Sequence, residues 1–355
     1  SQVLYNGKAG LIDLDLNQQQ KVLNSYGYPM GLADYSAFIL GGLPKQGQTL
    51  EEVKDLLLNE IKKLRAGEFD EKMLQANINN FKLYELQSME SNEGRADIFV
   101  NSFINGTNWE DEVTAIDRMA KLTKEDIVAF ADKYLKEDNY AVVYKKQGKD
   151  PNEKKMTKPE ITPIVSNRDV ASPFLTSIQE NAVKPIEPVF LDFKKDMSQL
   201  TAKSDIPVLY KQNTTNDLFQ LIYVFDMGNN NDKALGTAFD YLEYLGTSDM
   251  TPEELKSEFY RLACTFYVSP GNERTYVVLS GLNENMPAAM QLFEKLLADA
   301  QVNKEAYNNL VGDILKARAD AKLNQGQNFS RLMNYAMYGP KSPATNLLTE
   351  AELAS

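Results

Sequence analysis

Residues 38–74 read FILGGLPKQGQTLEEVKDLLLNEIKKLRAGEFDEKML, and this stretch decides the fold. The apolar run 38–43 predicts a strand that ends in a glycine turn. Thr49, with Glu52 three residues later, has the pattern of a capping box at a helix start. The apolar residues that follow recur at helical spacing up to Gly67, which is a typical helix stop. The stretch therefore predicts a strand, then an amphipathic helix, then the start of a long helix.

The same order of elements occurs again in the second half of the chain. Residues 277–282 predict a strand with glycine at its turn, and residues 286–300 predict an amphipathic helix. Each copy then continues with a long helix, a shorter helix that ends at glycine, and a helix start capped by threonine. The paired segments are 70–91 with 304–323, 95–105 with 330–338, and 122–127 with 348–353. The pattern is typical of a diverged duplication, and the alternative is a chance likeness of helix-rich segments.

Proline-rich residues 149–188 separate the two copies. Because proline is excluded from helix interiors and central strands, we expect an extended linker here, with a free disordered tether as the alternative. The apolar residues 188–191 are the part of it that we expect to pair with a sheet edge. We therefore expect one unit at 1–147, a proline-rich extended linker at 148–204, and a second unit at 205–355.

The ends of the two copies do not match. In copy one the threonine-capped helix is followed by a predicted strand at 140–144, whereas copy two stops inside the corresponding helix. Copy two also has residues before its strand and helix that copy one lacks. We therefore expect one or both units to be partial.

The chain contains no histidine and a single cysteine among 355 residues. Without histidine, serine and cysteine catalytic triads and nearly every hydrolytic zinc site are excluded. Cys264 lies in an apolar run, which favours a buried and inert thiol. We therefore expect no catalytic residue and no metal ligand in this chain.

The formal net charge is −12 and is dispersed along the sequence. This charge argues against nucleic acid as a partner, since phosphates require a basic surface. We also expect no membrane segment, because no run approaches the ~20 apolar residues that a membrane helix needs. No targeting peptide is visible at the first residues.

Several motifs of the first copy occur in an order that resembles a known family. Residues 67–71 open the long helix, and they are followed by 116–119, 122–127, 133–135 and the strand-like run 140–144. In this order they resemble the C-terminal part of a domain of pitrilysin/insulinase-type zinc metallopeptidases. The resemblance implies an α+β fold with two homologous metallohydrolase-like units, each an antiparallel-rich sheet with helices packed on one face. Residues 1–147 would be the later part of the family's second unit, and 205–355 most of its third.

The resemblance also implies a function. The family's zinc ligands and catalytic glutamate lie in its first unit, so zinc would be held outside this chain by the full-length parent. The slot of the zinc motif in the third unit falls on residues 237–241, where Thr237, Asp240 and Tyr241 stand in place of the motif residues. We expect these positions not to bind zinc. Asp240 and Glu243 form a carboxylate pair by spacing, but solvated surface charge is the favoured interpretation.

Two further features have competing interpretations. The strand with Gly41 and Gly42 could offer an edge to an extended substrate peptide, but structural turn glycines are the favoured interpretation. Aromatic residues recur at helical spacing in the first half, and we expect them to belong to the core. They are Phe81, Tyr84, Phe99, Phe103, Trp109, Phe130 and Tyr134.

The leading hypothesis is that this chain is the non-catalytic central region of a zinc metalloendopeptidase that degrades peptides in a clamshell chamber. Its partners would be peptide substrates of the parent and the remaining units of the same polypeptide. The resemblance suggests the bacterial periplasm or cell envelope. A catalytically dead homologue that scaffolds an active subunit is the alternative, and a freestanding peptide-binding module is a third hypothesis.

Overall fold

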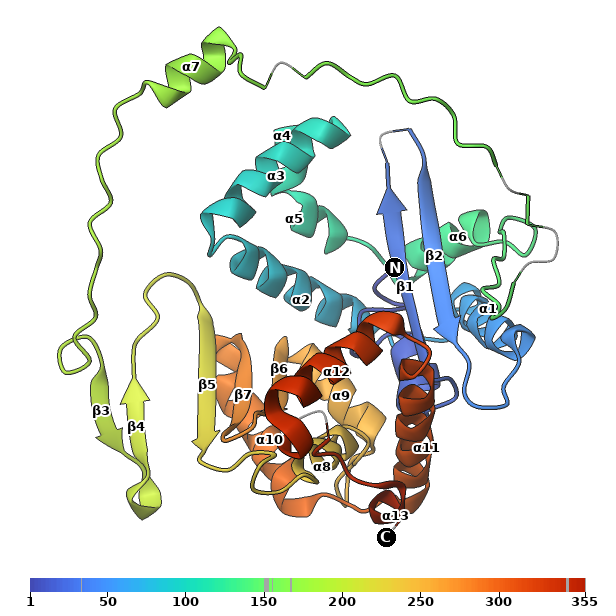
Figure 1. Cartoon of the computed structure of the whole chain (residues 1–355), viewed down its shortest axis with the longest axis vertical. Coiled ribbons are helices and arrows are strands. Elements are labelled where there is room, and N and C mark those ends of the chain that lie inside the picture. Colours follow the sequence, from blue (N-terminus) through green and yellow to red (C-terminus); the bar gives the residue numbers. More distant parts are fainter. Residues whose placement is uncertain (33, 150–152, 155, 167, 343–344, 355) are drawn as a thin grey trace. The chain divides into compact units, whose positions relative to one another are not determined.

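The structure is a computed structural model that describes residues 1–355 except 33, 150–152, 155, 167, 343–344 and 355. Its described residues form helices and small antiparallel sheets, in agreement with a mixed α and β fold (Figure 1). The chain divides into two compact units. The larger one combines Ser1–Val142 with Asn213–Ser355, and the smaller one is Val143–Gln212.

The larger unit begins with a short π-helix and a two-stranded hairpin. These elements are η1 (Asp13–Gln18), β1 (Asn24–Gly31) and β2 (Ser36–Leu43). The strands are antiparallel, and Tyr26 lies opposite Gly41 in the ladder. The strand predicted at 38–43 is therefore confirmed. Gly41 and Gly42 lie inside the ladder, so the prediction that they form a turn is wrong.

Helix α1 (Leu50–Ala66) follows the hairpin and is bounded as its sequence predicts. The Thr49 hydroxyl accepts a hydrogen bond from the Glu52 amide at 3.1 Å, and the Glu52 carboxylate accepts one from the Thr49 amide at 2.7 Å. At the other end Gly67 has φ of 70°, a left-handed conformation that glycine adopts without steric cost. Local sequence signals thus set both ends of α1.

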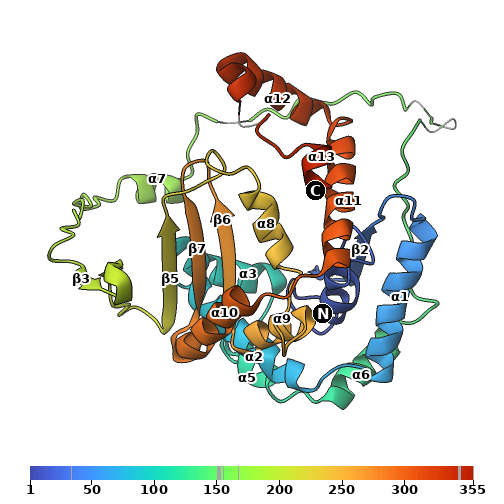
Figure 2. The ribbon, with the colours of Figure 1, turned by 90° about the horizontal axis from the view of Figure 1, so that it is seen from below.

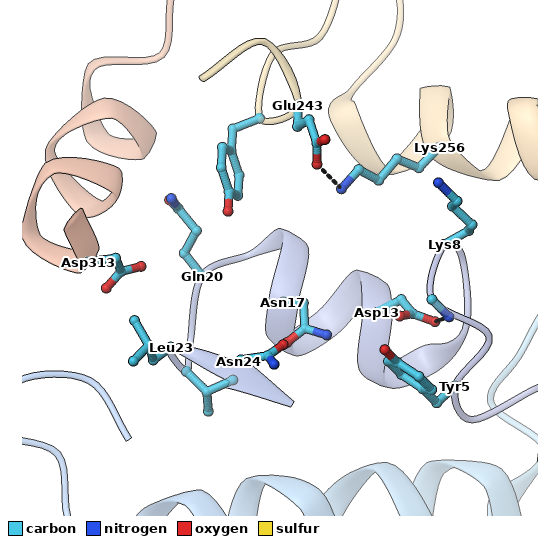
Figure 3. Close-up of a pocket in the computed structure, with 13 residues that line it drawn as sticks. Tyr5, Lys8, Asp13, Asn17, Gln20, Leu23, Asn24, Glu243, Lys256 and Asp313 are labelled. Atoms are coloured by element: carbon cyan, nitrogen blue, oxygen red, sulfur yellow. Dashed lines mark hydrogen bonds and ion pairs between the residues drawn. The ribbon is translucent and has the colours of Figure 1, made fainter. Parts of the chain in front are cut away.

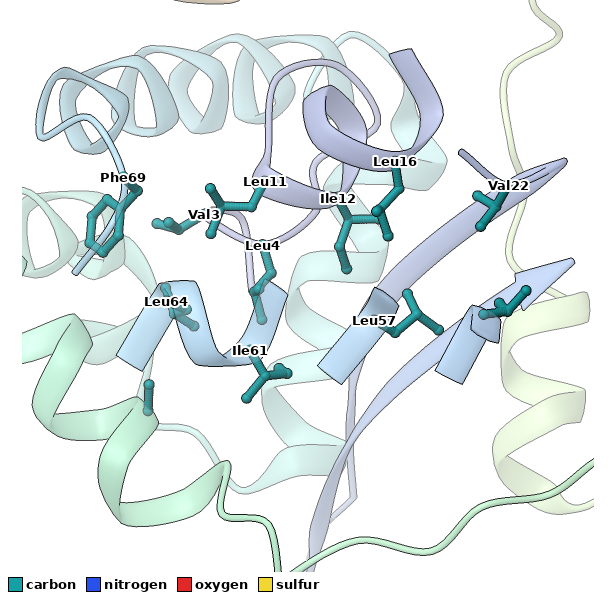
Figure 4. Close-up of a cluster of buried hydrophobic side chains, with 12 residues drawn as sticks. Val3, Leu4, Leu11, Ile12, Leu16, Val22, Leu57, Ile61, Leu64 and Phe69 are labelled. Carbon is teal, nitrogen blue, oxygen red and sulfur yellow. The ribbon is translucent and has the colours of Figure 1, made fainter. Parts of the chain in front are cut away.

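One face of α1 packs into the first hydrophobic core (Figure 4). The buried residues of α1 meet apolar side chains from the first turns of the chain and from η1. Ile12 and Leu16 are completely buried there. The α1 residues are Val53, Leu57, Ile61 and Leu64, and the N-terminal ones are Val3, Leu4, Leu11, Ile12 and Leu16.

A series of helices completes the first part of the larger unit. They are α2 (Lys72–Ser88), α3 (Asn92–Asn105), α4 (Trp109–Val113), α5 (Ala115–Met119) and α6 (Lys124–Tyr134). The strand predicted at 140–144 is absent, and that prediction is wrong. A strand needs a neighbour for its backbone groups; β1 and β2 pair only with each other, and Val143 is 92% exposed.

The second part of the larger unit contains a three-stranded antiparallel sheet in the order β5-β7-β6 (Figure 2). Its strands are β5 (Leu218–Phe225), β6 (Cys264–Pro270) and β7 (Thr275–Leu282). Helices α8 (Leu235–Leu242), α9 (Pro252–Arg261) and α10 (Met286–Asp299) contribute buried side chains to one core with these strands. The strand predicted at 277–282 and the helix predicted at 286–300 are confirmed.

Three further helices end the larger unit, namely α11 (Lys304–Ala321), α12 (Gln325–Tyr338) and α13 (Glu350–Leu353). The threonine-capped starts predicted at Thr123 and Thr349 are confirmed, and both are complete capping boxes. The predicted glycine stops are confirmed as well, with φ of 63° at Gly106 and 62° at Gly339. The individual starts and stops predicted at these positions are therefore present, while α4 and α5 have no helical counterpart of their kind between α12 and α13 among the described residues.

The two parts of the larger unit are joined by buried hydrogen bonds between α2 and α9. The Asn80 side chain donates to the Tyr260 carbonyl at 2.7 Å, and the Tyr260 hydroxyl donates to Asn77 Oδ1 at 2.8 Å. All three residues are buried. Polar groups that are fully paired in this way fix one arrangement of two helices.

The smaller unit contains most of the predicted linker. It holds α7 (Pro173–Gln179), the short η2 (Lys203–Asp205), and the antiparallel pair β3 (Ser198–Thr201) and β4 (Pro207–Tyr210). The expectation of an extended, irregular segment at 149–188 is therefore wrong at α7, and the other described residues of that segment form no helix or strand. Pro173 occupies the first turn of α7, where its missing N–H has no helical partner to lose. The run 188–191 forms no strand, which contradicts the predicted pairing with a sheet edge.

The aromatic residues predicted to lie in the core are mostly exposed. Phe103 is 87% exposed and Phe99 60%, and the Phe99 ring stacks on Trp109 with 4.5 Å between centroids. The spacing correctly places these side chains on common helix faces, but α3 buries only Ser102. Tyr84, Phe130 and Tyr134 are exposed too, and Phe81 is half-buried. Among the described helices, none combines the length and the hydropathy needed to cross a bilayer.

Candidate functional site

The predicted motif slot lies on α8, where its side chains serve packing. The Tyr241 hydroxyl donates to the Asn303 carbonyl at 2.7 Å and accepts from the Asn303 amide at 2.8 Å. Its ring meets Tyr307 edge-on, with 5.3 Å between centroids. Tyr241 therefore holds α8 against the start of α11, and its hydroxyl oxygen already makes two hydrogen bonds to Asn303.

The other two positions of the slot do not form a metal site with it. Thr237 is half-buried, and Asp240 is exposed. Loss of solvent around its carboxyl group, followed by the negative charge of Glu243, raises the pKa of Asp240. In the part of the chain that the structure describes, no three His, Cys, Asp or Glu side chains gather closely enough to hold a metal ion. Of the side chains that zinc takes as ligands, these three positions supply only the carboxylate of Asp240.

Gly41 and Gly42 are each enclosed by a side chain. A Cβ atom at Gly41 would lie 2.3 Å from Cζ of Tyr26, and one at Gly42 would lie 2.5 Å from Cγ1 of Val53. Both distances are far below van der Waals contact. A side chain at Gly42 would therefore collide with the buried Val53, whereas one at Gly41 would collide with the ring end of Tyr26, which is 36% exposed.

A polar pocket of about 230 Å³ opens between the N-terminal segment and helices of the second part (Figure 3). It lies within the larger unit. Four groups of residues form its wall, from the N-terminal turns, η1 and the residues after it, the end of α8 with α9, and α11. The lining residues are Tyr5, Gly7, Lys8, Asp13, Asn17, Gln20, Val22, Leu23, Asn24, Glu243, Tyr244, Lys256 and Asp313.

The backbone around this pocket departs from regular structure. Residues Asp13–Gln18 form a π-helix, a conformation found frequently at functional sites. Gln20 has φ of 50°, which is unusual for a residue with a side chain. Gln20 is buried, and its Nε2 donates to the Ala306 carbonyl at 3.2 Å. The pocket wall is thus held in this unusual geometry by a bond to α11.

Asp13 is the most enclosed charged group of the pocket, with 6% of its surface exposed. Its Oδ2 accepts hydrogen bonds from the amides of Asn6 at 2.9 Å, Gly7 at 3.2 Å and Gly10 at 2.9 Å. Burial raises the pKa of Asp13, and these amides and the charge of Lys256 act in the opposite direction. The carboxylate therefore closes the N-terminal loop that carries Lys8.

Lys256 extends from α9 into the pocket. Its Nζ lies 4.0 Å from Oε2 of Glu243, at the outer limit of an ion pair. Burial lowers the pKa of Lys256, the charge of Glu243 opposes this effect, and the charge of Lys8 adds to it. Lys8 is exposed and extends toward the same end of the pocket (Figure 3). Two ammonium groups thus share one end of the pocket.

The opposite end of the pocket is lined by Asp313 and Gln20 (Figure 3). Oδ2 of Asp313 lies 3.2 Å from Nζ of Lys45, so its charge is balanced from outside the pocket. Sequence reasoning missed this site entirely. Its residues come from segments far apart in the chain, and none of them belongs to a motif with a recognisable spacing.

No family model matches the sequence, and no curated protein matches it. Solved structures with a similar fold include the periplasmic protease PqqL from Escherichia coli, at 13% identity and a TM-score of 0.40, with 97% of this chain covered. The ferredoxin protease FusC in complex with Arabidopsis ferredoxin has 11% identity and a TM-score of 0.41, with 97% of this chain covered. A peptidase M16 inactive domain from Pseudomonas fluorescens has 17% identity and a TM-score of 0.38, with 45% of this chain and 42% of that chain covered.

This chain spans 40% of the length of the first and second of those structures. At these identities and TM-scores the likeness is one of fold and not of activity.

Proposed function

We propose that this chain is the non-catalytic central region of a zinc metalloendopeptidase of the pitrilysin/insulinase type. The observation that carries the proposal is a repeated order of capped elements in a chain that contains no histidine. The repeat supports a duplicated unit of this family. The missing histidines remove the chemistry by which such a unit would hold zinc.

The caps make the repeat more specific than a shared helix content. Helices α6 and α13 both begin with a threonine capping box. Helices α3 and α12 are equivalent in order and both end at a glycine with positive φ, although ψ differs, at 26° for Gly106 and −150° for Gly339. A threonine cap and a glycine stop at equivalent places support a common origin of the two parts.

Zinc, when bound elsewhere in the parent, would supply an activated water for peptide hydrolysis. The residues of the α8 slot, Thr237, Asp240 and Tyr241, do not fit such a metal. This chain would instead form wall and substrate-contacting surface in a chamber that closes around peptides. Its partners would be those peptides and the remaining units of the polypeptide, and we propose the periplasm or cell envelope as the location.

Metal analysis and a quenched-peptide assay test this proposal on two proteins, this chain and a longer polypeptide that contains it. We expect one zinc ion and peptidase activity only in the longer protein, with activity lost on chelation and restored by zinc. Zinc or chelator-sensitive activity in this chain alone would overturn the proposal. Since this chain serves as the control for the longer one, the same preparations separate the two outcomes.

A second candidate is a catalytically dead homologue that scaffolds an active subunit. The observation that favours it is the exposed apolar surface of α3, where Phe99, Val100, Phe103 and Ile104 are all more than half exposed. Apolar surface of this kind commonly marks a protein interface. A longer polypeptide without zinc that co-purifies with an active peptidase subunit is the result expected of this candidate.

A further inference from the structure

The lysine end of the polar pocket holds two ammonium groups, and only one of them has an ion pair among the described residues. Among the described residues Lys8 forms no ion pair, whereas Lys256 has one at the outer distance limit, with Glu243. The backbone at Lys8 is held in place because the Asn6 side chain accepts from the Lys8 amide at 3.0 Å and from the Ala9 amide at 2.8 Å. The pocket thus presents two cations at one end, and Lys8 is the one without an ion pair among the described residues (Figure 3).

The carboxylates of the pocket have other partners. Asp13 accepts three backbone amides, and Asp313 pairs with Lys45 outside the pocket. Only Glu243 faces the lysines without such commitments, and it is exposed. An additional anion at this end would therefore lower the repulsion between two ammonium groups.

We propose that this pocket binds a small carboxylate, held between the ammonium groups of Lys8 and Lys256. A carboxylate between two ammonium donors forms charge-assisted hydrogen bonds, which are about twice as strong as neutral ones. The remainder of the ligand is polar and uncharged, since amide and phenol groups of Gln20, Asn24 and Tyr244 line the rest of the wall. A dianion such as phosphate fits less well, because Glu243 and Asp13 stand close by and repel a second negative charge.

The volume of about 230 Å³ admits a molecule of the size of a dipeptide end or a small organic acid. Both present the same chemistry, one carboxylate on a short polar body. The proposal concerns binding by this chain alone and does not depend on the proposed peptidase function.

Isothermal titration calorimetry on the whole chain tests the proposal with three probes, N-acetylglycylglycine, its C-terminal amide and lactate. We expect binding of at least one carboxylate and none of the amide. Binding of the acetylated dipeptide in preference to lactate assigns the ligand to peptide C-termini, and the reverse assigns it to free organic acids. Equal binding of the amide, or no binding of either acid, overturns the proposal.

Three variants and a matched control locate the site. Lys8→Gln and Lys256→Gln should each weaken carboxylate binding by about tenfold or more, because each removes one charge-assisted hydrogen bond. Glu243→Gln should tighten it by a few-fold, since the competing carboxylate is lost. Lys121→Gln removes the same charge from an exposed position outside the pocket and should leave binding unchanged.

Lys8 is exposed, so its variant is expected to fold even if Lys256→Gln does not, and circular dichroism checks both. Unchanged affinity in a folded Lys8→Gln protein, or an equal loss in Lys121→Gln, contradicts the assignment. A Glu243→Gln protein that binds more weakly contradicts it as well.

Discussion

The ring of Tyr26 occupies the space that a side chain at Gly41, its partner across the β1–β2 ladder, would need. On the other face of the same strand, Val53 and Leu57 of α1 enclose Gly42 in the same way. The two faces differ in how easily they can adjust. Tyr26 is 36% exposed and is free to swing outward, whereas Val53 is 4% exposed and belongs to the first core.

We therefore predict unequal effects of adding one methyl group at these neighbouring glycines. Gly42→Ala should lower the free energy of unfolding by about 1–3 kcal/mol, because the buried Val53 cannot move away from the new Cβ. Gly41→Ala, the matched control, should cost less than about 1 kcal/mol. Urea unfolding followed by circular dichroism measures both. Equal costs would show that space around Val53 is not what requires glycine.

Glu60 of α1 is a buried carboxylate with an incomplete set of partners. It is 1% exposed, its Oε1 accepts from Lys63 Nζ at 3.0 Å, and its Oε2 has no partner among the described residues. Lys63 also pairs with Asp15 at 2.5 Å. Burial raises the pKa of Glu60 above 4.5, the bond from Lys63 opposes this, and the Asp15 carboxylate adds to it.

The sign of the resulting pH dependence follows from proton binding. The folded chain holds the Glu60 proton more tightly than the unfolded chain does, so this contribution to stability is complete below the unfolded pKa. It is lost as the pH rises through the folded pKa. Glu60→Gln should therefore raise the free energy of unfolding at about pH 8 by roughly 1–2 kcal/mol relative to the parent, and the gain should vanish near pH 4.5.

Urea titrations at several pH values measure this difference. Glu68→Gln serves as the control, since Glu68 is an exposed glutamate directly after α1 and its replacement should leave the pH profile unchanged. A Glu60→Gln protein that is less stable at high pH would mean that the bond to Lys63 outweighs the cost of burying the charge.

The contact of α2 with α9 gives a third prediction. Tyr260→Phe removes the hydroxyl that donates to Asn77 Oδ1 and leaves that buried oxygen without its partner. A buried acceptor left unpaired costs about 1–3 kcal/mol, and we expect that loss in thermal or urea unfolding. Tyr267→Phe, at a tyrosine that is 52% exposed, should change stability by less than about 0.5 kcal/mol. A Tyr260→Phe protein as stable as the parent would show that this bond does not join the two parts.

These relationships differ in how far the sequence predicts them. The caps at Thr49, Thr123 and Thr349 were predictable because a helix start depends on residues within one turn. The exposure of Phe103 was not, since helical spacing tells which side chains share a face but not whether anything covers that face. The strand expected at 140–144 failed for the same reason, because a strand requires a neighbour that local sequence does not specify.

The polar pocket was equally beyond sequence reasoning. Lys8 and Lys256 come together only because the N-terminal loop folds around Asp13 and α9 lies beside η1. Neither lysine stands in a motif, and a single charged residue in a sequence is more often on a solvated surface. A loop of small residues ends three residues before Asp13. The sequence does not show that Asp13 is buried, because burial depends on the tertiary structure.

The thiol of Cys264 provides the last prediction. The residue is 5% exposed at the start of β6, its Sγ donates to the Leu262 carbonyl at 3.4 Å, and burial raises its pKa to about 11 from 9.0. Each pKa unit changes the thiolate fraction tenfold near neutral pH, so the reactive fraction falls by about a hundredfold before access is considered.

We expect alkylation of the folded chain by iodoacetamide to be slower than that of the urea-unfolded chain by at least this factor, with one equivalent consumed after unfolding. Mass spectrometry over time measures both rates, and because the chain has a single cysteine no other site contributes. Labelling of the folded chain at the unfolded rate would show that the β6 edge opens readily and that Cys264 is not part of a closed core.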